Sequence, residues 1–163
     1  MVRFLIISLV LIPFAAAAQG QPAPRANANK NCFTKKEAEA ESEVRTGIKI
    51  REILRRCALV DPAGQPALDE WYKFDQENAE RLRNAVATRQ QAIARLFPNR
   101  SQASQWDTDA VVATSKSVQV NEGVCQATYD IVDRLKKEKW TGFKYYADLE
   151  NKLLVNEIPV CSR

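Results

Sequence analysis

The chain has 163 residues, with 24 lysines and arginines against 20 aspartates and glutamates, so its formal net charge is +4. This mild balance does not by itself indicate an anionic partner, and it disfavours nucleic-acid binding. Histidine is absent, which excludes Ser-His-Asp and Cys-His catalytic sites. The glycines are isolated from one another, which excludes a glycine-rich phosphate loop. A chain of this length buries one ordinary core, so we expect a single domain.

The first residues have the pattern of a secretory signal peptide. Arg3 precedes an apolar run over 4–14, and the alanines at 16–18 provide a cleavage site near Ala18–Gln19. No basic stop-transfer cluster follows, so we expect residues 1–18 to be removed rather than to anchor the chain. No other segment is apolar enough to cross a membrane. The sequence therefore predicts a periplasmic or secreted protein whose mature chain has no transmembrane segment.

Residues 19–31 are polar, contain two prolines and show no apolar periodicity, so we expect a disordered leader. Residues 32–163 have helical periodicity and form the predicted domain. A first helix should begin at Thr34, which makes a T-x-x-E capping box with Glu37, and should end before the proline- and glycine-containing stretch 61–66.

The clearest helical pattern runs over 67–97, where apolar residues recur at alternating spacings of three and four until Pro98. A third helix is predicted from Thr108 to about Trp140, with Gly142 as its terminator, although β-branched Val118 and Val120 weaken its propensity. A short fourth helix should cover 143–156. Short connections favour antiparallel neighbours, so the predicted fold is all-α, an up-down-up-down bundle of about four helices.

The four cysteines lie in the exported part, and an even number in an oxidising compartment indicates two disulfides. They do not form C-x-x-C pairs, so we expect no metal or haem site. Cys32 precedes the first helix and Cys57 lies in its last turn, roughly 35 Å away by helical rise, which excludes that pairing. Of the two remaining pairings, we favour Cys32–Cys161 and Cys57–Cys125, because the two cysteines of each pair should then lie at similar heights along the bundle.

Two polar residues, Asp75 and Arg89, interrupt the apolar seam of 67–97. If the third helix is antiparallel, Asp75 should lie opposite Tyr129 and Arg89 near Ser115. We favour buried hydrogen-bonded pairs that fix the register of the two helices. The alternative is a binding cavity lined by an acid and a base.

Glu122 is predicted on the inward side of the third helix, where an ion pair with Arg81 or Arg83 is favoured over a lone catalytic carboxylate. Gly47 and Gly123 lie at similar heights within predicted helices. Glycine inside a helix costs about 1 kcal/mol relative to alanine, and close helix approach is the favoured compensation. A small internal cavity is the alternative.

Basic residues gather towards one predicted end of the bundle, followed by aromatic residues. This candidate interaction patch comprises Arg55, Arg56, Arg134, Lys136, Lys137, Lys139 and Trp140. Its partner would be another envelope protein or an anionic envelope polymer. The competing interpretation is a solvated surface, because cations are favoured near helix C-termini in any case.

These features favour an exported, non-enzymatic helical protein without a cofactor, acting as a protein-binding module of the cell envelope of the adaptor, chaperone or inhibitor type. The main alternative is a carrier of a small molecule held between the helices. A third hypothesis is an enzyme that uses only carboxylates and tyrosine, which would need two acids close together in a cleft.

Overall fold

The computed structural model describes residues 32–154, 157 and 160–161, and over these residues the chain is all-helical, as predicted. The predicted signal peptide (1–18) and leader (19–31) lie outside the described residues. Within the described part, no helix is both long and apolar enough to span a membrane.

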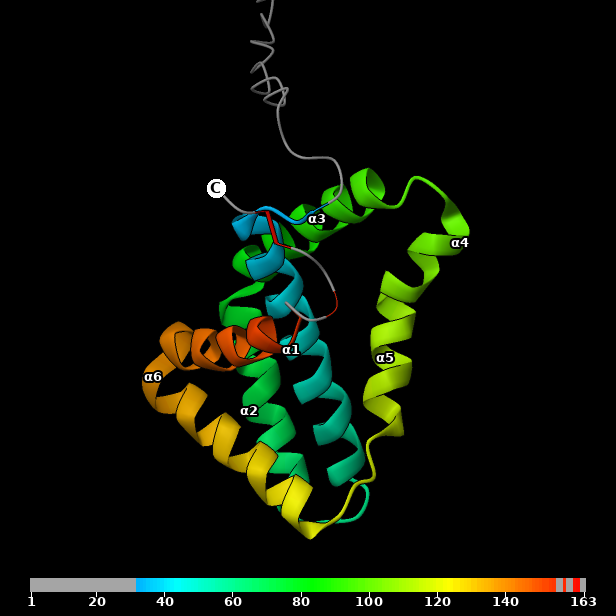
Figure 1. Ribbon diagram of the computed structural model, residues 1–163. Helices are drawn as coiled ribbons and strands as arrows, with labels where there is room; N and C mark the ends of the chain where they lie inside the picture. Colours follow the sequence, from blue (N-terminus) through cyan, green and yellow to red (C-terminus); the bar gives the residue numbers. More distant parts are fainter. Residues whose placement is uncertain (1–31, 155–156, 158–159, 162–163) are drawn as a thin grey trace, which may run out of the picture.

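The helices differ in number and order from the expectation (Figure 1). They are α1 (Lys35–Cys57), α2 (Gly64–Glu77), α3 (Ala79–Leu96), α4 (Arg100–Ala103), the 3-10 helix η1 (Ser104–Trp106), α5 (Thr108–Ser117) and α6 (Glu122–Leu154). In Figure 1, α2 and α3 return alongside α1, α5 runs beside it, and the second half of α6 crosses it. A four-helix count and an up-down-up-down order are therefore not confirmed.

The central element is α1, which contacts α2, α3, α5 and α6. It begins with the predicted capping box: the Thr34 backbone donates to the Glu37 carboxylate (2.7 Å), and the Glu37 backbone donates to the Thr34 hydroxyl (3.3 Å). Because neighbours surround it, α1 also buries polar side chains, including Glu41 and Glu52. Such burial requires paired partners, since an unpaired buried charge is costly.

The helix predicted over 67–97 is divided at Asn78, whose backbone (φ −111°, ψ 15°) leaves the helical region. Its side-chain amide donates to the carbonyl of Phe74 (2.9 Å). Asparagine is a weak helix former because its side chain competes in this way with the backbone for hydrogen bonds. At the other end, α2 begins earlier than expected. A Cβ on Gly64 would lie 2.5 Å from the backbone nitrogen of Ala58, so only glycine fits this contact with the end of α1.

The helix predicted over 108–140 also divides, at Val118, where the backbone becomes extended (ψ 122°). Arg56 donates to the carbonyls of Lys116 (3.0 Å) and Val118 (2.6 Å), which satisfies the end of α5. The predicted boundary between the third and fourth helices is instead a kink within α6, at Lys139 (φ 54°, ψ −134°).

Both predicted disulfides are present, with Cα atoms 5.2 Å apart for Cys32–Cys161 and 5.7 Å apart for Cys57–Cys125. The backbone nitrogen of Cys161 also donates to the carbonyl of Phe33 (2.8 Å). Cys125 lies in the first turn of α6, whereas the helix predicted over 108–140 would have placed it in a helix interior. The first disulfide thus joins the two ends of the domain, and the second joins the end of α1 to the start of α6.

Arg89 is buried, as its place in the seam predicted, but Ser115 is not its partner. Its Nε donates to Glu41 of α1 (2.6 Å), and its other nitrogens donate to the carbonyl of Trp106 and the hydroxyl of Thr108 (3.4 Å). Arg45 donates to the second oxygen of Glu41 (2.7 Å). This network fixes α3 and the start of α5 against α1.

The expected Asp75–Tyr129 pair is wrong. Asp75 is exposed, and the hydroxyl of Tyr129 donates to Asp61 in the turn before α2 (3.0 Å). Burial and the bond to Asp61 raise the pKa of Tyr129 to about 12. Glu122 is also exposed, in the first turn of α6, and makes no described ion pair with Arg81 or Arg83. Register therefore depends on Glu41 and Asp61, neither of which lies in the predicted seam.

Candidate functional site

The residues of the predicted basic patch lie on two elements. Arg55 and Arg56 are in the last turn of α1, beside Lys116 of α5. The other five, Arg134, Lys136, Lys137, Lys139 and Trp140, are on α6. Among the described contacts, no hydrogen bond or ion pair joins the two groups. Arg55 and Arg56 line a hollow beside Lys116, whereas Lys136 and Lys139 line a different one between α2 and α6.

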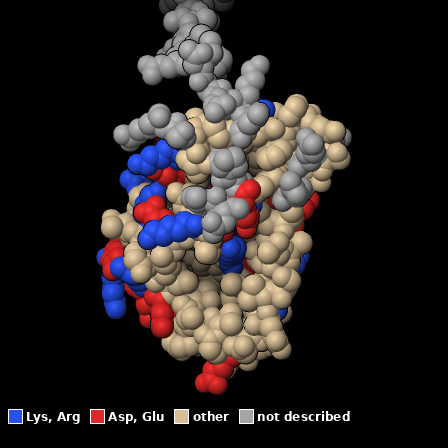
Figure 2. All heavy atoms as spheres, viewed as in Figure 1, with Lys and Arg blue, Asp and Glu red and all other residues tan. Residues whose placement is uncertain are grey.

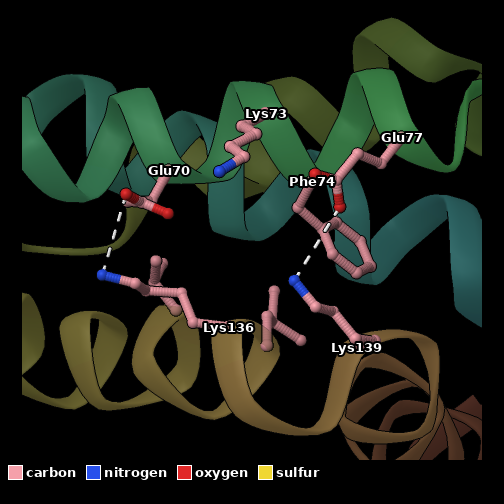
Figure 3. A pocket seen from close by; sticks show the side chains of 8 residues that line it. Glu70, Lys73, Phe74, Glu77, Lys136 and Lys139 are labelled. Atoms are coloured by element: carbon pink, nitrogen blue, oxygen red, sulfur yellow. Dashed lines mark ion pairs between the residues drawn. The ribbon is translucent and has the colours of Figure 1, made fainter.

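Charges on the α6 part of the patch are largely balanced. A pocket of about 170 Å³ between α2 and α6 shows Lys136 facing Glu70 (3.7 Å) and Lys139 facing Glu77 (4.0 Å) (Figure 3). Arg134 pairs with Glu138 (2.9 Å), and this hydrogen bond raises the pKa of its guanidinium. Figure 2 shows basic and acidic side chains interleaved on the visible face. This arrangement weakens attraction for an anionic polymer.

The second half of α6 presents an exposed apolar surface, here named the α6 face. It consists of Tyr145, Leu149 and Leu153, which are 46%, 41% and 63% exposed. Their spacing of four residues puts them on one side of the helix. The Tyr145 ring is held in place, with the guanidinium of Arg134 4.1 Å from its centroid and the Tyr146 ring at 5.2 Å. The α6 face therefore combines an aromatic ring in a fixed orientation with two solvent-exposed leucines.

A groove of about 230 Å³, here named the Trp71 groove, lies between α1 and the α2–α3 pair. Its lining residues are Glu43, Val44, Gly47, Ile48, Arg51, Trp71, Asp75, Leu82, Val86 and Thr108. Apolar side chains form most of the walls, and charged side chains lie at the rim. The seam predicted over 67–97 therefore remains partly unfilled where Leu82 and Val86 face α1.

Trp71 is 2% exposed, and its ring packs against Phe74 (centroids 5.6 Å apart) and Phe143 (6.3 Å). Its indole Nε1 is buried and has no hydrogen-bond partner among the described residues. An unpaired buried donor costs about 1–3 kcal/mol. Trp71 lines the groove, so a bound ligand whose acceptor reaches the Nε1 would remove this cost.

Two of the three charged residues at the rim already have partners. Glu43 pairs with Lys144 (3.1 Å), and Arg51 pairs with Glu52 (3.1 Å). Burial lowers the pKa of Lys144, but its ion pair with Glu43 outweighs this effect, and the net shift is upward. Asp75 makes no hydrogen bond or ion pair within the described part of the chain. The groove therefore presents one unpaired negative charge.

The two alternatives for the helical glycines were close helix approach and a small internal cavity. Gly47 agrees with the second. It lines the Trp71 groove, and a Cβ there would meet the Trp71 ring at 3.9 Å, an ordinary contact distance. Gly123 is exposed and has only the side chain of Asn121 nearby (3.5 Å), so the predicted close approach of these two glycines is wrong.

No protein-family model, characterised protein or solved structure matches this chain. The surfaces of the molecule itself are therefore the guide to its function. Over the described ranges, no cluster of three or more acidic or cysteine side chains is arranged to hold a metal ion.

Sequence reasoning missed the most enclosed features of the groove. The sequence did not single out Trp71, and nothing in the sequence shows that its indole nitrogen lacks an acceptor. Gly47 was the one available signal, because an uncompensated glycine inside a helix suggests either close packing or space. Leu149 and Leu153 of the α6 face lie within the predicted fourth helix, but nothing in the sequence shows that they are exposed.

Proposed function

We propose that the protein is exported and acts, without catalysis, as a module that binds another protein of the cell envelope. The observation that supports this most is the α6 face. Exposed residues at positions i, i+4 and i+8 form the kind of surface by which an amphipathic helix docks into a partner's apolar groove. The signal-peptide pattern and the two disulfides support export to an oxidising compartment.

Tyr145 is the expected anchor of this interface. Tyrosine and arginine are enriched among the residues that dominate binding energy. Arg134 and Tyr146 hold the Tyr145 ring before any partner arrives, so binding would lose little side-chain freedom. In this proposal Arg134, a member of the predicted patch, contributes by positioning the ring rather than by attracting an anion.

The test is native mass spectrometry of the protein purified from the envelope of its own host. We expect a complex with a second protein, and we expect Leu149→Glu to remove that complex. Val60→Glu is the matched control, because Val60 is an exposed aliphatic residue in the turn after α1. A complex that survives Leu149→Glu would refute the assignment of the α6 face, and a bare chain without any partner would refute the function.

The second candidate function is a carrier of a small molecule, and the Trp71 groove is the observation that favours it. In the same native mass spectrum, a carrier would release a small mass on denaturation, without a protein partner. This outcome would be unaffected by Leu149→Glu, because the α6 face and the groove share no residue.

A further inference from the structure

We propose that the Trp71 groove binds a small organic amine that has an apolar body and an oxygen able to accept a hydrogen bond. This proposal rests on the second candidate function, the carrier, and does not depend on the α6 face. Three features of the groove carry it: its size, the unpaired donor of Trp71 and the unpaired carboxylate of Asp75.

The volume limits the ligand to a single ring with a short chain. The groove encloses about 230 Å³. Apolar cavities of about 150 Å³ bind benzene, whereas drug-sized ligands occupy roughly 300 Å³ or more. The walls suit an apolar body because Val44, Ile48 and Leu82 line them, and Gly47 leaves the α1 side open against the Trp71 ring.

The donor of Trp71 specifies an acceptor on the ligand. An indole nitrogen can only donate, so a hydrocarbon would leave it unpaired, while a hydroxyl or carbonyl oxygen would satisfy it. Sites built to bond a polar group discriminate against analogues that lack it, since the buried protein group is then left without a partner. The orientation of the ring is fixed by Phe74 and Phe143, so the donor is held in one place.

Asp75 specifies the charge. It follows Trp71 by one helical turn, which puts the two side chains on the same side of α2. Lys144 and Glu52 compensate the other rim charges, on Glu43 and Arg51, so the uncompensated charge at the groove is negative. A cationic amine would pair with Asp75, while a carboxylate ligand would be repelled.

Three matched compounds separate these features. Tyramine carries a ring, a hydroxyl and an amine; phenethylamine lacks the hydroxyl; 4-hydroxyphenylacetate replaces the amine by a carboxylate. Each is titrated into the disulfide-bonded protein, with the indole N–H signals followed in ¹H–¹⁵N correlation spectra. The three tryptophans give three such signals, and Trp71→Phe identifies the one from Trp71. Trp106 provides an internal control, since its Nε1 is also buried and unpaired but lies outside the groove.

We expect tyramine to move the Trp71 signal and leave the Trp106 signal in place, and to bind about tenfold more tightly than either analogue. Asp75→Asn should remove the advantage over 4-hydroxyphenylacetate, and Trp71→Phe the advantage over phenethylamine. Gly47→Leu should fill the groove and abolish binding. Asp75 is exposed, and a Cβ on Gly47 would meet the Trp71 ring at an ordinary contact distance of 3.9 Å, so these two variants should fold even if Trp71→Phe does not.

The proposal is overturned if tyramine at about 10 mM leaves the Trp71 signal unchanged, or if all three compounds bind alike. Binding that persists in Gly47→Leu would place the site elsewhere and overturn it equally. Because these titrations use purified protein, their failure leaves the interaction at the α6 face untouched. A missing envelope partner, in turn, says nothing against the groove.

Discussion

Replacing Arg89 with alanine should destabilise the fold more than any exposed charge substitution. The Arg89 side chain is 3% exposed and donates to Glu41, to Thr108 and to the carbonyl of Trp106, so it joins three segments of the chain. Its loss leaves the Glu41 carboxylate, which is 1% exposed, with Arg45 alone. Removing one partner of a buried ion pair costs about 3–5 kcal/mol.

That cost is large beside the total stability of an ordinary domain, about 5–15 kcal/mol. The control is Lys136→Ala, which breaks the pair with Glu70 in which the side chains are 50% and 36% exposed. An exposed pair of this kind contributes at most about 1 kcal/mol. Arg89→Met keeps much of the aliphatic packing but not the charge, so it should be nearly as damaging as Arg89→Ala.

Urea denaturation, followed by circular dichroism with both disulfides intact, measures these differences directly. Equal midpoints for Arg89→Ala and Lys136→Ala would show that the network does not stabilise the fold. Full rescue by Arg89→Met would show that packing of the side-chain stem, and not the pairing of Glu41, is what matters.

Three further predictions concern single positions. Gly47→Ala should stabilise α1 by up to about 1 kcal/mol in the same urea assay, while Gly64→Ala should cost about 3 kcal/mol or more, because its Cβ would overlap backbone atoms. Lys139→Gly should raise the thermal midpoint by relieving the positive φ, whereas the neighbouring Lys137→Gly should lower it. Since the pKa of Tyr129 is raised from 10.0 to about 12, its neutral form is favoured in the folded state, so that stability is complete below pH 10 and declines between pH 10 and 12. Tyr129→Phe should lack this part of the alkaline decline; an identical decline would contradict the assignment.

Local sequence patterns were sufficient for some features of the fold. The capping box needs only Thr34 and Glu37, three residues apart, and the structure contains both of its bonds. The length of α1 was enough to exclude a Cys32–Cys57 disulfide, because one uninterrupted helix holds these cysteines too far apart to bond. The choice of Cys32–Cys161 and Cys57–Cys125 also used the heights of the cysteines in the predicted bundle. The capping box and the exclusion of Cys32–Cys57 do not depend on helix order, which is why both hold although the up-down-up-down order is not confirmed.

Features that depend on tertiary contacts could not be read from the chain. The central position of α1 could not be predicted from its apolar residues alone. It also buries polar side chains such as Glu41, which is paired with Arg89 of α3, and such a partner is not visible in the sequence of α1. The helix over 67–97 read as continuous because Asn78 breaks a helix only when its side chain bonds back to Phe74. The Trp71 groove depends on the central position of α1 and on the break at Asn78, since it lies between α1 and the two helices α2 and α3.

The two disulfides have a topological consequence for how the protein meets proteases. Cys32–Cys161 closes the domain into a covalent ring, and Cys57–Cys125 is a second cross-link within this ring. A single peptide-bond cut anywhere between Cys32 and Cys161 therefore opens the ring without separating any fragment. The connection between α3 and α5 can be nicked while all helices remain tethered, so two cuts, or a cut and a reductant, are needed before a piece can leave.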